Sequence, residues 1–164
     1  MLGESSVYPD GVLDVSVVVV ACFDNPLRTH AVRFLNEVLT QRRRAALPVS
    51  AIIGAYHIAT RYLRVERLAV KRLLEKLLET RSPALYPQIT LQQAIDALEY
   101  AAYYNVEAWD GYLVSLARSL GTSTIYSLDK ELARIREVTV VNPFPEEAVK
   151  EYHKFIRDLL QVNP

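Results

Sequence analysis

Near its N-terminus the chain reads Val12-Leu13-Asp14-Val15-Ser16, in which a carboxylate directly follows a short apolar segment. A second carboxylate, Asp129, comes shortly after the β-branched segment 123–126. Further short strands are predicted at 47–49 and 138–141, and helical segments lie between successive strands. Strands separated by helices form a parallel sheet covered on both faces, so this order predicts an α/β fold.

The helices are predicted from apolar residues that recur at intervals of three and four positions. Asn25-Pro26 is a helix-start signal, with Asn25 as the cap and Pro26 in the first turn. Thr90 is the expected cap of a later helix, and Gly121 is expected to end the one after it. The predicted spans are residues 25–42, 52–63, 70–78, 91–102, 109–120 and 145–161.

The composition is that of one globular domain. Of 164 residues, 51% are apolar and 23% are charged. The longest purely apolar run, Val17–Phe23, is far shorter than the roughly 20 residues that cross a bilayer. No signal peptide is recognisable, and the single cysteine, Cys22, is expected to be a buried structural thiol. We therefore expect a cytoplasmic protein that does not associate with a membrane.

Several classes of function are excluded by what the sequence lacks. It contains no GxxxxGK[ST], GxGxxG, GxSxG, CxxC or HExxH pattern, so neither nucleotide-dependent nor zinc chemistry is expected. The formal net charge is zero, with +4 on residues 1–82 and −4 on residues 83–164. Any binding of nucleic acid must therefore come from a local basic patch.

Three carboxylates stand at positions suited to chemistry. Asp14 and Asp129 follow strands, and ligands of open parallel sheets bind beyond the carboxyl ends of the strands. Asp110 lies in the first turn of an apolar helix, which can hold it nearby. Three such groups repel one another unless a cation such as Mg²⁺ or Mn²⁺ joins them. Each taken singly also has an ordinary structural interpretation, as a turn, helix-terminal or capping residue.

The sequence resembles the PIN-domain family over residues 11–143. The stretch 13–16 is similar to the first PIN motif, 109–117 to the family's "yDa…A" helix, and 126–132 to its "T-x-D-x-x-L" segment. The resemblance implies a three-layer α/β/α fold with a mostly parallel central sheet. It also implies a helix directly after Asp14, although Val15–Phe23 has the composition of a strand.

The site residues follow from the same resemblance. Asp14, Asp110 and Asp129 would be the catalytic and metal-binding residues, with Mg²⁺ or Mn²⁺ as the cofactor. Ser16 and Ser127 would support them by hydrogen bonding. The family normally carries a Glu on the helix after the second strand, but His57, or Tyr56 if the register slips by one, stands there. Neutral histidine suits Mn²⁺ better than Mg²⁺, and His57 could equally be a structural side chain packed between helices.

The resemblance implies a metal-dependent endoribonuclease that cleaves single-stranded RNA, with toxins of toxin–antitoxin pairs (VapC type) among its relatives. The expected partners are RNA, an antitoxin protein and a second copy in a homodimer. The alternative is a PIN-fold binding or assembly module whose catalysis has weakened with the missing Glu.

Two further features extend beyond the motifs. A basic cluster at residues 60–72 is either a solvated face or a surface that contacts RNA phosphates. Its members are Arg61, Arg64, Arg67, Lys71 and Arg72. The domain is expected to comprise residues 1–143. Residues 144–164 form a C-terminal helical extension that packs on the same domain or docks on a second subunit or partner protein.

Overall fold

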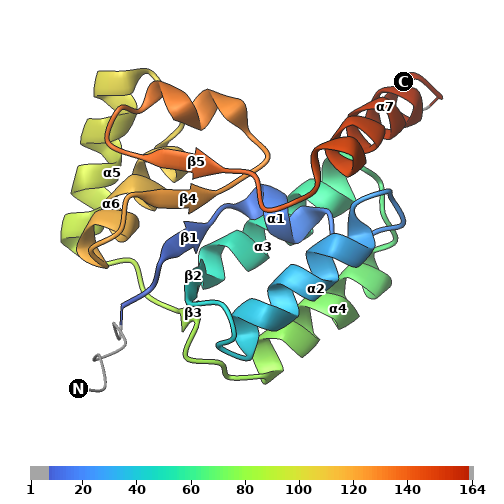
Figure 1. Cartoon of the computed structure of the whole chain (residues 1–164), viewed down its shortest axis with the longest axis horizontal. Coiled ribbons are helices and arrows are strands. Elements are labelled where there is room, and N and C mark those ends of the chain that lie inside the picture. The colour runs from blue at the N-terminus through green and yellow to red at the C-terminus, as the bar shows by residue number, and fades with distance from the viewer. Residues whose placement is uncertain (1–7, 163–164) are drawn as a thin grey trace.

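A computed structural model describes residues 8–162 and contains one central five-stranded sheet (Figure 1). The strand order is β3-β2-β1-β4-β5, and every neighbouring pair is parallel. The predicted α/β class and parallel sheet are therefore confirmed. The strands are β1 Gly11–Leu13, β2 Ala45–Pro48, β3 Leu85–Tyr86, β4 Thr124–Tyr126 and β5 Thr139–Val141.

Helices cover both faces of this sheet, which gives the expected three layers. The α5–α6 pair lies on one side of the sheet, and α2 and α4 lie on the other (Figure 1). Two separate apolar clusters fill the spaces between the layers. The helices are α1 Val15–Val19, α2 Arg28–Leu39, α3 Val49–His57, the π-helix η1 Ile58–Tyr62, α4 Arg67–Glu79, α5 Leu91–Tyr104, α6 Ala108–Ser119, the 3₁₀-helix η2 Lys130–Arg134 and α7 Glu146–Val162.

The segment after Asp14 is helical in spite of its β-branched composition. Residues 15–19 form α1, and Asp14 is its N-cap. Val17 and Val18 are fully buried, so tertiary packing outweighs the strand propensity of the valines. Strand β3 was not predicted from the sequence. The β-branched composition of residues 138–141 predicts a fully buried strand, but this was wrong: β5 is an edge strand whose Thr139 and Val141 are exposed.

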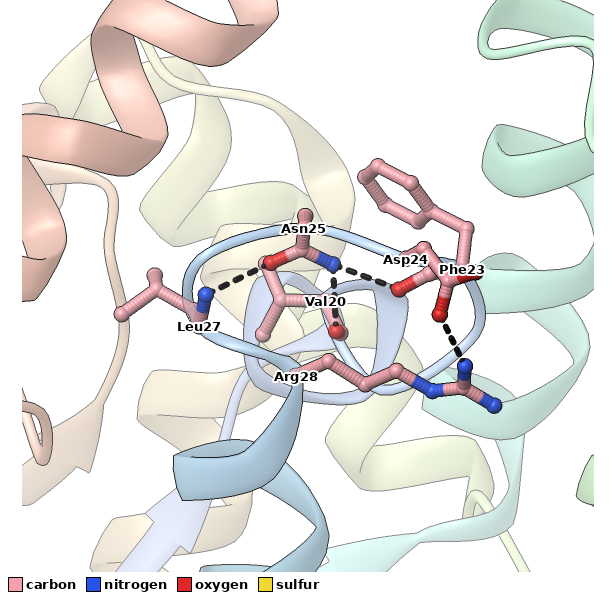
Figure 2. A network of polar contacts seen from close by, with 6 residues as sticks. All are labelled: Val20, Phe23, Asp24, Asn25, Leu27 and Arg28. Atoms are coloured by element: carbon pink, nitrogen blue, oxygen red, sulfur yellow. Dashed lines mark hydrogen bonds and ion pairs between the residues drawn. The ribbon is translucent and has the colours of Figure 1, made fainter.

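The start of α2 also differs from the prediction. The helix begins at Arg28, and Asn25 closes the preceding loop instead of capping the helix (Figure 2). Its amide nitrogen donates to the carbonyl oxygens of Val20 and Phe23, each at 2.8 Å. Its carbonyl oxygen accepts from the backbone N–H of Leu27, also at 2.8 Å. The side chain therefore fixes the turn by which the chain leaves α1.

Helices α5 and α6 approach closely because a glycine lies between them. Thr90 caps α5 in a capping box with Gln93, as predicted in part from the sequence. On α6, a Cβ added to Gly111 would lie 2.1 Å from the backbone oxygen of Ala97 on α5. No side chain larger than hydrogen fits that position without movement of a backbone. Gly111 thus sets the distance between the two helices, directly beside Asp110.

The C-terminal helix α7 contacts the body of the domain through its first turns. Val149 is buried, and the ring of Phe155 lies 6.4 Å from that of Phe23. Tyr152 and Ile156 pack against the same apolar cluster. The far end of α7 projects from the body, where Leu160 is half exposed (Figure 1). Within residues 8–162, no helix has the length and apolarity needed to cross a membrane.

Candidate active site

Asp14 lies at the carboxyl end of the central strand β1 and is buried, with 7% of its surface exposed. Its Oδ2 accepts hydrogen bonds from the hydroxyls of Ser16 and Ser127, each at 2.7 Å. The backbone N–H of Ser16 points to the same oxygen at 3.4 Å. These donors fix the orientation of the carboxylate. Asp14 is therefore held in place by Ser16, which follows β1, and by Ser127, which follows β4.

The two serines also position the loop that carries Asp129. The Ser16 hydroxyl accepts from the backbone N–H of Leu128 at 3.0 Å, and the Ser127 hydroxyl accepts from that of Asp129 at 2.9 Å. The two hydroxyls are 3.2 Å apart. Asp129 itself is exposed and caps η2, since its Oδ1 accepts from the N–H of Glu131 at 2.9 Å. One oxygen of the Asp129 carboxylate is thus occupied by the hydrogen bond that caps η2.

Asp110 lies in the first turn of α6 and is the most strongly perturbed carboxyl of the group. Burial, followed by the negative charges of Asp14, Asp129 and Glu107, raises its pKa from an ordinary value of 3.8 to about 6. A backbone hydrogen bond involving Glu107 opposes part of this rise in pKa. The carboxylates therefore repel one another across a shared space, and a bound cation would relieve the repulsion.

That shared space is a cavity of about 1120 Å³. Asp14, Ser16, His57, Asp110 and Asp129 all line its wall, so five of the six predicted site residues come together. The sixth, Ser127, is 1% exposed and supports Asp14 from beneath. The rest of the wall comes from helices α1, α3, α6 and α7, from η1 and η2, from the end of β2 and from the loop before α6.

His57 ends α3 and is exposed to solvent. Its ring lies edge to face with that of Tyr62, with ring centroids 5.6 Å apart. Among residues 8–162, no three Asp, Glu, His or Cys side chains lie close enough to hold a metal ion together. Mg²⁺ typically uses only one or two protein carboxylates and completes its shell with waters and substrate phosphates. The donors present fit a cation bound in that way.

Sequence reasoning missed two parts of the site. Glu107 lines the cavity and acts on Asp110, and its place three residues before Asp110 at a helix start was the available signal. Tyr152 and Ile156 of α7 also line the cavity. Burial raises the pKa of Tyr152 to about 12, so its hydroxyl stays protonated. No motif marked α7 as part of the site.

The family model described as PIN domain matches residues 11–138. This chain belongs to the PIN-domain family. PIN domains are a family of nucleases whose members generally bind RNA and use divalent metal ions. The match spans all three aspartates and the two serines that bind Asp14, whereas α7 lies beyond it.

A solved structure shares the fold of this PIN domain. It is the crystal structure of PAE2754 from Pyrobaculum aerophilum, with a TM-score of 0.57 and 15% sequence identity. The alignment covers 98% of this chain and 96% of that chain. At this identity the likeness concerns the fold alone. A search of curated proteins gave no match.

Removing the Ser127 hydroxyl is expected to destabilise this PIN domain by about 1–3 kcal/mol. In Ser127→Ala the buried carboxylate of Asp14 loses a donor at 2.7 Å, and the N–H of Asp129 loses its acceptor. Urea unfolding followed by circular dichroism measures the change. Ser123→Ala, at an exposed position just before β4, is the matched control and should shift the free energy of unfolding by less than about 0.5 kcal/mol. Equal stability of the two variants would show that the serine bridge contributes nothing.

Proposed function

We propose that this PIN domain is a divalent-metal-dependent endoribonuclease that cleaves single-stranded RNA. The observation that carries the proposal is the group of three aspartates that line one cavity, where burial and then the charges of Asp14 and Asp129 raise the pKa of Asp110 to about 6. Such mutual repulsion costs free energy in the absence of a cation, and it is typical of sites built to bind one. The family adds nucleic acid as the substrate.

Asp14, Asp110 and Asp129 would hold Mg²⁺ or Mn²⁺, one or two of them by direct contact and the rest through waters bound to the ion. When bound, such an ion lowers the pKa of a water molecule and neutralises charge that develops on a phosphate. The protein supplies the orientation of the ligands: Ser16 and Ser127 hold the Asp14 carboxylate, and the cap to Glu131 holds Asp129. Arg134, which also lines the cavity, is placed to contact a phosphate.

His57 stands where the family normally has a glutamate. It borders the cavity, so in this proposal it takes the fourth position of the site as a neutral ligand or water-binding group. Imidazole binds Mn²⁺ more readily than Mg²⁺. Activity is therefore expected to be higher with Mn²⁺.

Asp129→Asn is the sharpest first test of the nuclease, because asparagine keeps the cap of η2 and removes only the charge. Cleavage of labelled single-stranded RNA in Mn²⁺ is expected to fall by about 10- to 100-fold. Asp10→Asn is the control. Asp10 is exposed and lies just before the N-terminal end of β1, away from the cavity. Its substitution should therefore leave the rate of RNA cleavage unchanged.

The same cleavage assay distinguishes the nuclease from a second candidate function. The glutamate missing at His57 favours a PIN-fold binding or assembly module with weakened catalysis. Absence of cleavage in the folded wild type, with no effect of Mn²⁺ on its thermal stability, would support that module over the nuclease. A toxin role, an antitoxin partner and a homodimer stay predictions from the family resemblance.

A further inference from the structure

Two large aromatic side chains border the acidic cavity and yet remain open to solvent. Tyr62 and Trp109 line it and have exposed fractions of 63% and 61%. They come from different parts of the chain, the end of η1 and the first turn of α6. Single exposed aromatics are ordinary on protein surfaces, but two on the wall of one cavity form a distinct feature.

A local irregularity in the backbone gives Tyr62 its position. Helix α3 continues into the π-helix η1, in which the N–H of Leu63 bonds to the oxygen of Ile58 at 3.2 Å. The wider turn changes the direction of the side chains that follow it, and such turns are frequent at functional sites. The ring of His57 then lies against Tyr62 at nearly a right angle, which restricts its orientation. Tyr62 is thus held at the cavity instead of packing into the core.

Trp109 directly precedes Asp110 in the first turn of α6. Asp110 is half-buried and borders the cavity, and the indole directly before it stays exposed. In RNA bound with a phosphate at the carboxylates, the base that stacks on this indole would belong to the same nucleotide or to an adjacent one. The cavity, at about 1120 Å³, is as large as the sites that take drug-sized ligands.

Electrostatics alone cannot hold RNA at this cavity. Its acidic residues outnumber Arg134, and the chain as a whole has no net charge; the acids are Asp14, Asp110, Asp129, Glu107 and Glu131. Phosphate attraction supplies most of the affinity of basic nucleic-acid binders, and here it is weak. Apart from the basic cluster at residues 60–72 outside the cavity, stacking on aromatic rings is the source of affinity that this wall offers, worth about 1–3 kcal/mol per base.

We propose that Tyr62 and Trp109 form a stacking site for unpaired bases of RNA beside the carboxylates. This inference rests on the proposed function and specifies its substrate: single-stranded RNA, engaged through its bases as well as its phosphates. Paired bases present no free faces to these rings, so a duplex is excluded from the site.

Trp109 is the only tryptophan, so its fluorescence reports on the site directly. The wild-type chain is titrated in EDTA with a short single-stranded oligoadenylate, with an abasic oligonucleotide of equal length, and with the duplex of the first. We expect quenching by the oligoadenylate and binding at least fivefold weaker for the other two. Equal binding of the abasic strand would overturn the proposal.

Variants test each ring by anisotropy of fluorescein-labelled oligoadenylate. Tyr62→Ala and Trp109→Ala are each expected to weaken binding at least fivefold, while Tyr62→Phe retains it. Tyr103→Ala is the control, since Tyr103 is 82% exposed on α5 but does not border the cavity. Equal affinity of both alanine variants and the control would refute the stacking site. Metal-dependent cleavage without any base dependence would leave the nuclease standing and reject the stacking site, whereas base-dependent binding without cleavage would do the reverse.

Discussion

Asp110→Asn is expected to lower RNA cleavage by about 100- to 1000-fold and at the same time to stabilise the metal-free protein. Burial, and then the charges of Asp14, Asp129 and Glu107, make Asp110 hard to ionise. A bound cation would offset that cost, so the loss of this charge should weaken binding of the metal. Asparagine keeps the shape of the side chain without its charge.

The gain in stability depends on pH in a defined direction. The pKa of Asp110 is about 6 in the folded chain, above its ordinary value of 3.8. Between pH 4 and pH 6 the folded protein holds a proton that the unfolded chain has lost, so the wild type loses stability as the pH rises through this interval. Asp110→Asn removes this loss. Allowing for partial solvent screening, it should exceed the wild type by about 1–2 kcal/mol above pH 6 and by little at pH 4.

Thermal unfolding at several pH values, with and without Mn²⁺, measures both effects. The wild type should gain stability with Mn²⁺ at pH 8, and Asp110→Asn should gain little, because a ligand stabilises only the state that binds it. Asp10→Asn again serves as the control for loss of a surface charge. If Asp110→Asn is no more stable than the wild type at pH 8, the ionised Asp110 carboxylate does not destabilise the metal-free fold.

Gly111→Ala is expected to destabilise the domain by about 3 kcal/mol, lowering the Tm by about 6–12 °C. The added methyl would lie 2.1 Å from the oxygen of Ala97 and 3.2 Å from its Cα. Both are backbone atoms, so no side-chain rotation relieves the contact, and α5 and α6 have to separate. Since Asp110 precedes this position, the displacement should also reduce cleavage.

Gly54→Ala is a matched control within a helix of the same domain. An added Cβ at Gly54 meets only Cγ2 of Val15, the end of a side chain, at 3.3 Å. Alanine is also the better helix former, so the change in stability should stay within about 1 kcal/mol. If the two alanine variants unfold at the same temperature, the close approach of α5 to α6 does not limit stability.

The sequence was most informative where local chemistry fixes the structure. Asp14 and Asp129 follow buried strands, and Asp110 opens an apolar helix, so their meeting follows from a parallel sheet. The Thr90 cap of α5 was likewise visible, because Gln93 completes the capping box. Strand order, helix periodicity and capping preference brought out these residues, and the resemblance to the PIN family assigned the aspartates to one site.

Features that depend on tertiary packing were not predictable. The two-residue strand β3 is too short to produce a periodic signal, and it forms because β2 lies beside it. The π-helix η1 leaves no mark in the pattern of residues 52–63, although it determines where Tyr62 lies. The contribution of α7 to the cavity depends on how a helix beyond the family motifs packs, which composition does not reveal.

The hydrogen bond between Asp14 and Ser127 joins residues 113 positions apart, and this has a consequence for the order of events on the ribosome. At a synthesis rate of about 5–20 residues per second, Ser127 is made roughly 6–20 s after Asp14. During that interval the central strand can pair with β2 but has no β4 on its other side. The complete group of carboxylates exists only once Asp129 has been translated. On the proposed function, a nascent chain that ends before Asp129 would therefore lack the complete acidic site for cutting RNA.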